Sequence, residues 1–256
     1  MSPRKIISQR IEAGEETKDG QTATYELIRP KPKQTEPSTV ARISEPDWSE
    51  AFELVPSLQV AYVWHASVFT REVLNGLERI GFLYPQQIIW DKGRVVLTRT
   101  HYWYQHEPCW YVRKKKAHWF GEAGKNATIW SCPSPKFIMG GSKEDKFDHP
   151  TQKPVELMRR PILNHTKRGE LVYDPFLGSG TTLAAAELTE RACCGIELDT
   201  KYVDVVVLRW QTLSGQRATL DGDGRTFAEI KAERFLIKLG AQDLIKEDIE
   251  ERISRA

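Results

Sequence analysis

The stretch LVYDPFLGSGTTLAAAELTERACCGIELD, residues 171–199, decides the fold. It opens on apolar residues 171–173, which predict a buried strand. Gly178 and Gly180 then allow a sharp turn that brings backbone amides close to a ligand. Residues 181–188 are rich in alanine and predict a helix. A strand, a glycine-rich turn and a helix in this order indicate the start of a nucleotide-binding unit.

The same stretch ends in a second strand, predicted over residues 193–198, with Glu197 near its end. Glu197 lies 17 residues after Gly180. An acid at about this distance from the turn suits a bidentate contact with ribose hydroxyls. The ligand is therefore expected to contain a nucleoside.

The residues around the turn narrow the choice of nucleotide. Gly180 is followed by Thr181 and Thr182, and not by the lysine that a phosphate-binding P-loop needs. Leu183 stands where a dinucleotide fingerprint would have its third glycine. Asp174 would repel a pyrophosphate but attract an ammonium or a sulfonium group. A cationic adenosine ligand fits these residues better than a diphosphate.

Three blocks of the sequence carry a family resemblance. The run DPFLGSGTT, residues 174–182, resembles the cofactor loop of S-adenosylmethionine-dependent DNA amino-methyltransferases, which modify adenine N6 or cytosine N4. The block HPTQKP, residues 149–154, is similar to the other cofactor motif of that family. GIELD at 195–199, followed by Tyr202, matches its acidic strand end. The resemblance extends over about residues 43–220.

The resemblance implies a fold, a cofactor and a partner. The fold is α/β, with a Rossmann-like, mostly parallel sheet flanked by helices, an inserted target-recognition region and a C-terminal helical extension. The cofactor is S-adenosyl-L-methionine, and the partner is double-stranded DNA with an extruded base. Asp174 would lie on the methionine and sulfonium side, Glu197 would hold the ribose, and Thr151 and Lys153 would approach the methionine carboxylate. The full set of cofactor-binding residues implied is Thr151, Lys153, Asp174, Pro175, Phe176, Gly178, Ser179, Gly180, Thr181, Thr182, Glu197 and Leu198.

The family's beta arrangement places the catalytic half before the cofactor half, with the target-recognition region between them. Residues 58–66, 86–90 and 106–112 predict strands in this earlier half, and residues 68–80 predict an amphipathic helix. Family members carry a loop of the form Asp/Asn/Ser-Pro-Pro-aromatic upstream of the first of these strands. The present sequence contains no Pro-Pro pair, so no catalytic residue is assigned.

That loop has a chemical purpose. An exocyclic amine is a poor nucleophile because its lone pair is delocalised into the base, so its hydrogens must be accepted by a side chain and a backbone carbonyl. Two segments, Ser44–Trp48 and Ser131–Pro135, resemble the loop superficially. The first is better explained as a helix boundary capped by Asp47 or Ser49, and the second lies at the exit of the recognition region.

The polar composition of residues 1–39 suggests why the catalytic loop is missing from this sequence. In the family an insertion of such composition commonly follows the catalytic loop, so Met1 would be an internal start with the strand and its loop upstream. The sheet would then lack a central strand and expose apolar edges on both of its neighbours. Such a protein would be unstable alone or would need another chain to fill the space.

Composition sets the domain count. The chain has 256 residues, enough for one α/β domain, which we divide into a polar segment 1–42, a methyltransferase domain 43–222 with the recognition region at about 92–148, and a helical extension 223–256. An apolar stripe in the extension packs on its own domain or forms an oligomer contact.

The four cysteines contain no Cys-x-x-Cys pair, so neither a metal site nor disulfides are expected. Without a signal peptide or a long apolar run, the protein is expected inside the cell, in the cytoplasm or at the nucleoid.

Basic and aromatic residues gather in one part of the chain. Between Arg79 and Phe120 there are eight lysines or arginines against two acids, and aromatic residues are interleaved with them. This pattern suits phosphate contacts and stacking on an extruded base, although Trp110 and Tyr111 also fit a strand in the core. The candidate DNA-binding residues are Arg94, Arg99, His101, Tyr102, Trp103, Lys114, Lys115 and Lys116.

Three functions fit these observations. The first is an active DNA methyltransferase, of the kind found in restriction-modification, whose catalytic loop is degenerate or comes from another chain. The second is an inactive subunit that binds the cofactor and DNA, as a homodimer or beside a second methyltransferase chain. The third is an RNA or small-molecule methyltransferase of the same fold. The sequence leaves the target base and the recognition site open.

Overall fold

The computed structural model describes most of the chain between residues 51 and 237. The described residues are 5–7, 23–26, 51–52, 54–96, 99, 101–122, 124–135, 144–147 and 152–237. The strands are β1 (Lys5–Ile7), β2 (Ala23–Glu26), β3 (Val60–Trp64), β4 (Leu83–Val96), β5 (Tyr104–Arg113), β6 (Ile129–Ser131), β7 (Leu171–Asp174), β8 (Ala192–Gly195) and β9 (Ala218–Leu220). The helices are η1 (Ser67–Phe69), α2 (Thr70–Arg79), α3 (Val155–His165), α4 (Thr181–Leu188) and α5 (Thr200–Ser214), followed by a helix over 227–237.

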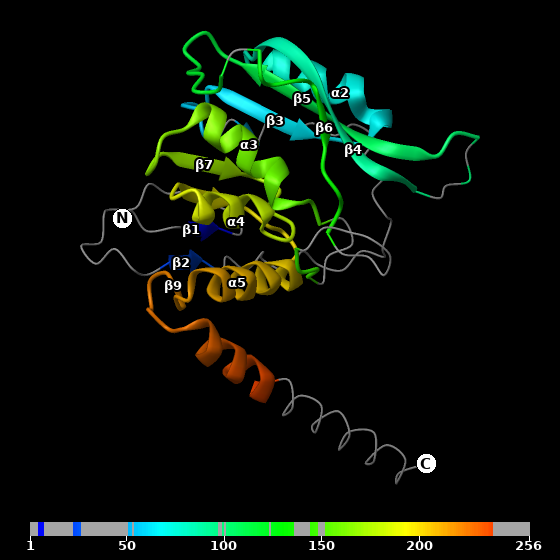
Figure 1. Cartoon of the computed structure of the whole chain (residues 1–256). Coiled ribbons are helices and arrows are strands. Elements are labelled where there is room, and N and C mark those ends of the chain that lie inside the picture. Colours follow the sequence, from blue (N-terminus) through cyan, green and yellow to red (C-terminus); the bar gives the residue numbers. More distant parts are fainter. Residues whose placement is uncertain are drawn as a thin grey trace, which may run out of the picture.

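These strands form two sheets (Figure 1). The first has the order β7-β8-β1-β2-β9, and every pairing in it is parallel. The second has the order β3-β5-β4-β6, with antiparallel pairing of β5 to both of its neighbours and parallel pairing of β4 to β6. The predicted α/β class with a mostly parallel sheet is confirmed. Among the described strands, however, the sheet is divided between β3 and β7.

Most predicted elements lie where the apolar pattern places them, with two corrections. The strand predicted over 86–90 is the centre of β4, which has 14 residues. Beyond Asp91, where its pairing with β6 ends, β4 pairs with β5 alone in a projecting hairpin, and its polar residues there show no apolar alternation. The strand predicted over 193–198 ends at Gly195, and Glu197 therefore follows β8. The predicted start of the recognition region, residue 92, falls inside β4.

The helix after the glycine turn is buried on nearly all sides. Ala184, Ala185 and Ala186 of α4 are at most 3% exposed. Methyl side chains let α4 approach its neighbours closely, and Val207 and Trp210 of α5 pack in the same cluster. The alanine-rich sequence therefore specifies a helix that is buried in the core cluster beside the parallel sheet.

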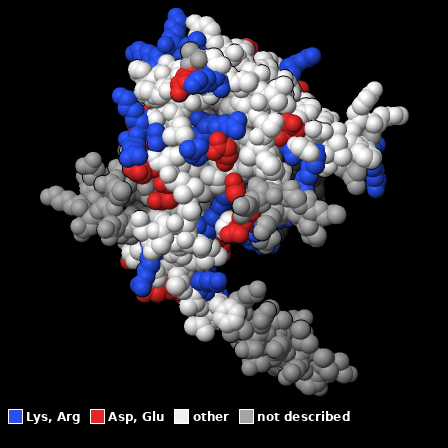
Figure 2. Space-filling view, in the orientation of Figure 1, with Lys and Arg blue, Asp and Glu red and all other residues white. Residues whose placement is uncertain are grey.

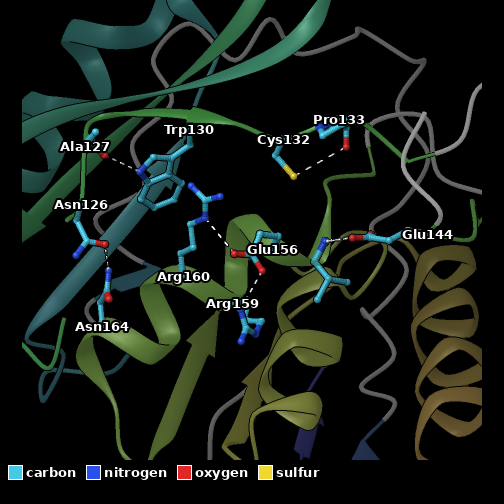
Figure 3. Close-up of polar contacts among 11 residues, drawn as sticks. Asn126, Ala127, Trp130, Cys132, Pro133, Glu144, Glu156, Arg159, Arg160 and Asn164 are labelled. Atoms are coloured by element: carbon cyan, nitrogen blue, oxygen red, sulfur yellow. Dashed lines mark hydrogen bonds and ion pairs between the residues drawn. The ribbon is translucent and has the colours of Figure 1, made fainter. Parts of the chain in front are cut away.

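Helix α3 connects the two sheets. Met158 packs against the core cluster of the parallel sheet and also against that of the mixed sheet. The first turn of α3 is capped by the Glu144 carboxylate, which accepts the Val155 N–H at 3.0 Å (Figure 3). On its outer face, Arg160 pairs with Glu156 and lies over the Trp130 ring of β6. Among the helices of the described residues, none has the length and apolar character required to span a bilayer.

Candidate cofactor site

The glycine turn stands at the carboxyl end of β7 and begins α4. Gly180 is the N-cap of α4 with φ of 75°, and Gly178 has φ of 53°, both in the left-handed region that favours glycine. A Cβ on Gly180 would meet Val206 Cγ1 of α5 at 3.1 Å. The turn therefore requires glycine at residue 180 for its backbone angle and for the close approach of α5.

Two carboxylates hold the turn from both sides. Asp174 accepts the Phe176 N–H at 3.0 Å, and Glu197 accepts the Gly178 N–H at 2.7 Å through one oxygen and the Asp199 N–H at 2.9 Å through the other. Burial raises the pKa of Asp174, although hydrogen bonds from Thr182 and Phe176 oppose this shift. Each carboxylate oxygen can accept more than one hydrogen bond, so Glu197 retains acceptor capacity for a ligand.

A buried arginine, which the sequence patterns did not single out, braces the same turn. Arg209 of α5 is 6% exposed and donates from Nη1 to the Ser179 carbonyl at 2.9 Å and to Thr181 Oγ1 at 3.1 Å. Its guanidinium also lies 4.8 Å from the centre of the Phe147 ring. Arg209 lies seven residues after Tyr202 on one helix, and its charge between the apolar Leu208 and Trp210 is its only mark in the sequence.

Lys153 joins the cofactor loop to the mixed sheet. Its Nζ lies 3.1 Å from Glu107 Oε2 of β5, and its carbonyl accepts a hydrogen bond from Thr181 Oγ1 at 3.2 Å. Lys92 of β4 lies 2.6 Å from the other oxygen of Glu107. Burial alone would raise the pKa of Glu107, but Lys153 and Lys92 outweigh it and lower the pKa. Glu107 was not predicted as a site residue, because the sequence does not show that two distant lysines meet it.

A cavity of about 560 Å³ opens beside the turn and continues between the two sheets. Of the predicted cofactor residues, those that line it are Lys153, Asp174, Pro175, Phe176, Gly178, Ser179, Thr181 and Thr182. Gly180 and Glu197 support the turn from outside the cavity, and Leu198 is exposed. Thr151 lies outside the described residues. The structure thus assembles most of the predicted cofactor residues in one place.

The candidate DNA-binding residues fall into two groups at opposite ends of β5. Arg94, Arg99 and residues 101–103 belong to the β4–β5 hairpin, which projects from the body in Figures 1 and 2. Tyr102 and Trp103 are 91% and 52% exposed. Residues 114–116 follow the other end of β5, about 30 Å away at the rise of an antiparallel strand. The structure therefore does not bring the two groups together.

Only the hairpin lies on the side of the cofactor turn. β3 and β7 run in the same direction in Figure 1, and β5 begins beyond the carboxyl end of β3, where Trp64 pairs with Cys109. The lysines lie at the opposite edge, where the Lys114 N–H donates to the Gln59 carbonyl before β3 begins. Ligands of parallel sheets bind at the carboxyl ends of the strands. Of the two groups the hairpin lies at that end, whereas Lys116 lines the cavity that the turn also lines.

The two segments that resembled a catalytic loop do not complete the site. Ser131–Pro135 begins at the last residue of β6 and runs along the side of α3, where Cys132 Sγ contacts the Pro133 carbonyl (Figure 3). None of its residues lines the cavity. Ser44–Trp48 lies outside the described residues.

Several relatives with known descriptions match part of this chain. Type II methyltransferase M.HinfI of Haemophilus influenzae is 30% identical over an alignment of 148 residues, which covers 52% of this chain and 41% of that protein. Type II methyltransferase M2.DpnII of Streptococcus pneumoniae is 32% identical over 138 residues, 50% of this chain and 52% of that protein. The DNA adenine methyltransferase YhdJ of Escherichia coli is 36% identical over 86 residues, 34% of this chain and 28% of that protein. The chain therefore spans about half or less of the length of these relatives.

Solved structures agree on the fold. The crystal structure of the M1.HpyAVI–SAM complex matches with a TM-score of 0.53 and 28% identity, covering 64% of this chain and 80% of that one. The cytosine-N4-specific PvuII DNA methyltransferase matches with a TM-score of 0.52 at 14% identity, which supports the fold alone. Residues 64–208, more than half of the chain, match the family model described as DNA methylase. The chain belongs to this N6/N4 DNA methylase family.

Proposed function

We propose that the protein is an S-adenosylmethionine-dependent DNA methyltransferase that modifies an exocyclic amine, adenine N6 or cytosine N4. The observation that carries this proposal is the turn at residues 174–180, which is built rigidly at the carboxyl end of β7 and opens on a cavity. The family membership and the cofactor-bound relative support the same cofactor. The alternative of a generic nucleotide site is not supported, because the turn lacks the lysine of a P-loop and the third glycine of a dinucleotide fingerprint.

The residues of the turn fit a cationic adenosine ligand. Asp174 and Glu197 supply negative charge on both sides of the turn, and Phe176 is 54% exposed beside the cavity, where an apolar ring can cover a ligand. Lys153 presents an ammonium group to the cavity while paired with Glu107. Because an ammonium has three donors, it can also contact the methionine carboxylate. S-adenosylmethionine, when bound, supplies the methyl group that is transferred.

The DNA would approach over the β4–β5 hairpin. Tyr102 and Trp103 offer exposed rings for stacking, and Arg94 and Arg99 offer charge for phosphates. The lysines at 114–116 lie at the other end of β5, and Lys116 lines the cavity that the cofactor turn also lines, so a DNA contact of these lysines stays a separate prediction. The division into a methyltransferase domain at 43–222, a recognition region at about 92–148 and an extension at 223–256 is part of this proposal.

A second candidate function has a specific observation in its favour. β3 and β7 are the terminal strands of the two sheets, and no described strand pairs with the sides that face each other. A chain of this kind would bind cofactor and DNA but depend on another polypeptide, a second copy or a different methyltransferase chain, for transfer. Since the substrate of either function is DNA, the expected location is the cytoplasm or the nucleoid.

Methyl incorporation tests the proposal directly. Purified protein is incubated with radiolabelled S-adenosylmethionine and unmethylated DNA, and the digested nucleosides are separated. N6-methyladenine or N4-methylcytosine supports the first function. Binding of S-adenosylmethionine in calorimetry without turnover supports the second, and transfer to tRNA or rRNA but not to DNA would contradict both.

A further inference from the structure

A second cavity, of about 430 Å³, lies on the face of the mixed sheet that α3 covers. Its walls include Tyr62 of β3, Tyr111 of β5 and Trp130 of β6, together with His165 at the end of α3. No residue of the cofactor loop 174–182 lines it, although the two cavities share the wall around Tyr62 and His165. Cavities of about 300–1,000 Å³ hold small ligands, so this one is large enough for a ligand of its own.

The loop between β5 and β6 closes this cavity and is anchored on both sides. The Phe120 N–H donates to the Asn164 carbonyl of α3 at 2.7 Å. Closer to β6, the Trp130 indole N–H donates to the Ala127 carbonyl at 2.8 Å (Figure 3). These bonds fix the loop over the sheet, so the cavity is formed before a ligand enters. A preformed cavity loses little free energy in ordering its walls.

His165 fixes the aromatic wall of the cavity. Its Nδ1 lies 2.6 Å from the His118 carbonyl, which can only accept, so Nδ1 carries the hydrogen and Nε2 accepts from the Tyr62 hydroxyl at 3.1 Å. Burial lowers the pKa of His165, which keeps the ring neutral at pH 7. The rings of Tyr111 and Trp119 have their centres 5.6 and 5.2 Å from the imidazole. The wall is therefore an uncharged group of rings suited to a flat ligand.

Arg113 brings a positive charge to the same cavity. Its guanidinium lies 4.3 Å from the centre of the Tyr84 ring, and no carboxylate of the described residues pairs with it. Tyr84 has φ of 53°, a backbone angle that is strained for a bulky residue and that clusters at functional sites. The carboxylate of Glu122, which also lines the cavity, pairs with Lys125. The balance of charge in the cavity therefore favours an anionic group.

Three side-chain amides complete the lining, those of Gln86, Asn126 and Asn164. An amide both donates and accepts, which matches the hydrogen-bonding edge of a nucleobase. The rings can stack on the base, and a guanidinium pairs well with a phosphate. A quaternary ammonium also binds among aromatic rings, but the charge of Arg113 would repel it.

Basic residues also surround this part of the surface. Residues 114–116 are lysines that follow Arg113, and Lys167 and Arg168 follow α3, although Arg168 pairs with Glu190. Figure 2 shows Lys and Arg side chains gathered at the upper left, on the side where β7 begins in Figure 1. A positive field of this kind raises the local concentration of an anionic ligand.

We propose that this second cavity binds a nucleoside monophosphate unit, with its base among the rings of Tyr111, Trp119 and Trp130 and its phosphate at Arg113. A free nucleotide and a nucleotide within a single strand share this chemistry. The site is distinct from the cofactor turn, because α3 begins beside the turn and reaches the cavity only with its last residues, about 15 Å further along at the helical rise. It does not depend on the proposed methyl transfer.

Calorimetry of the full chain tests the site with adenosine, guanosine, cytidine and thymidine 5′-monophosphates. We expect at least one to bind with a Kd below about 1 mM, and its nucleoside to bind at least about fivefold more weakly. Failure of all four to bind would overturn the proposal. Titrations with excess S-adenosylmethionine should give the same nucleotide affinity. Displacement of the nucleotide would place it in the cofactor cavity and would also overturn the proposal.

Matched variants locate the bound nucleotide. Trp119 and Phe120 are neighbours in one loop and both are 44% exposed, but only Trp119 lines the cavity. Trp119→Ala should weaken the nucleotide about tenfold and Phe120→Ala less than about twofold. Arg113→Met should abolish the preference for nucleotide over nucleoside, whereas Arg71→Met, on the exposed surface of α2, should preserve it. Equal losses within either pair would contradict the site.

The wild-type protein answers the same question through its indole N–H resonances. The nucleotide should shift those of Trp119 and Trp130 and leave that of Trp210, which is buried beside the parallel sheet. A shift confined to Trp64, which lines the cofactor cavity alone, would overturn the proposal.

A 5′-phosphorylated single-stranded hexanucleotide distinguishes the two sources of the ligand. Binding more than about tenfold tighter than the mononucleotide, with the gain lost in Trp119→Ala, assigns the site to a strand. Equal affinity of the two probes assigns it to a free nucleotide.

Discussion

The two sheets present opposite kinds of surface at the same edge of the molecule. At the end of β7, the glycine turn is held by Asp174, Glu197 and Arg209, and its polar groups are bonded before any ligand arrives. Beyond the end of β3, the β4–β5 hairpin projects with Tyr102 and Trp103 exposed. The first surface is preorganised, so little of the binding free energy is spent on ordering the turn. The second is open, as suits a partner that must be approached and released.

The comparison predicts that changes in the turn act strongly and on one ligand, and that changes in the hairpin act weakly and on another. Four experiments test it, and each has a control drawn from a matching position of the chain.

Gly180→Ala should have the largest effect. With φ of 75° and Val206 at 3.1 Å from an added Cβ, the turn must shift, and S-adenosylmethionine binding should fall about 100-fold in calorimetry. Gly169→Ala carries a similar φ of 81° with nothing within 4 Å, so it isolates the backbone cost. Equal cofactor affinity in the two variants would show that the contact with α5 does not shape the turn.

Glu107→Gln should cost about 2 kcal/mol of unfolding free energy at pH 7, because it leaves Lys92 and Lys153 without their half-buried, ionised partner. The pKa of Glu107 is lowered in the folded state, so its stabilisation is present above the ordinary value of 4.5 and disappears as the pH falls through the folded-state pKa. Denaturant titrations of wild type and variant should therefore converge in acid. Glu122→Gln, at an exposed pair with Lys125, should cost less than about 0.5 kcal/mol, and a pH-independent gap for Glu107 would contradict the ion-pair explanation.

Arg209→Met should weaken cofactor binding about tenfold, because the Ser179 carbonyl and the Thr181 hydroxyl lose a buried donor while the packing volume is kept. As a positioning residue, it should act through the order of the turn, so amide exchange at Gly180 should speed up in the free protein. The control is Arg159→Met on the exposed face of α3, for which no change is expected. Unchanged exchange together with weaker binding would indicate a direct contact instead.

Trp103→Ala should have the smallest effect, a loss of about fivefold in DNA affinity from one stacking side chain. Cofactor affinity should stay the same, since the hairpin does not line the cavity. Lys115→Ala, at the other end of β5, should change DNA affinity less than about twofold. A larger loss for Lys115 in filter binding at constant salt would place the DNA on the opposite edge of the sheet.

The local sequence pattern was sufficient to predict the strand, turn and helix of the parallel sheet that carry the cofactor loop. The spacing from Leu171 through Gly180 to Glu197 predicted β7, the turn and α4 at the correct residues, because a glycine turn and an alanine-rich helix depend on neighbours in sequence. It failed at the end of β8, where the chain turns so that Glu197 can bond to Gly178. It also failed in the second half of β4, where pairing with β5 and not apolar alternation makes the strand.

The sequence by itself determined the family, the cofactor loop and the absence of a Pro-Pro catalytic motif, since these are properties of short runs of residues. Only the tertiary structure decided which residues meet across long separations. It brings Arg209 to the turn, joins Glu107 to Lys153 and separates the hairpin from the lysines at 114–116. It also shows that β3 and β7 end two sheets and line one cavity, with no described strand paired to their facing sides. The physical reason is that hydrogen-bond pairing and burial are set by neighbours in space, and no local periodicity records them.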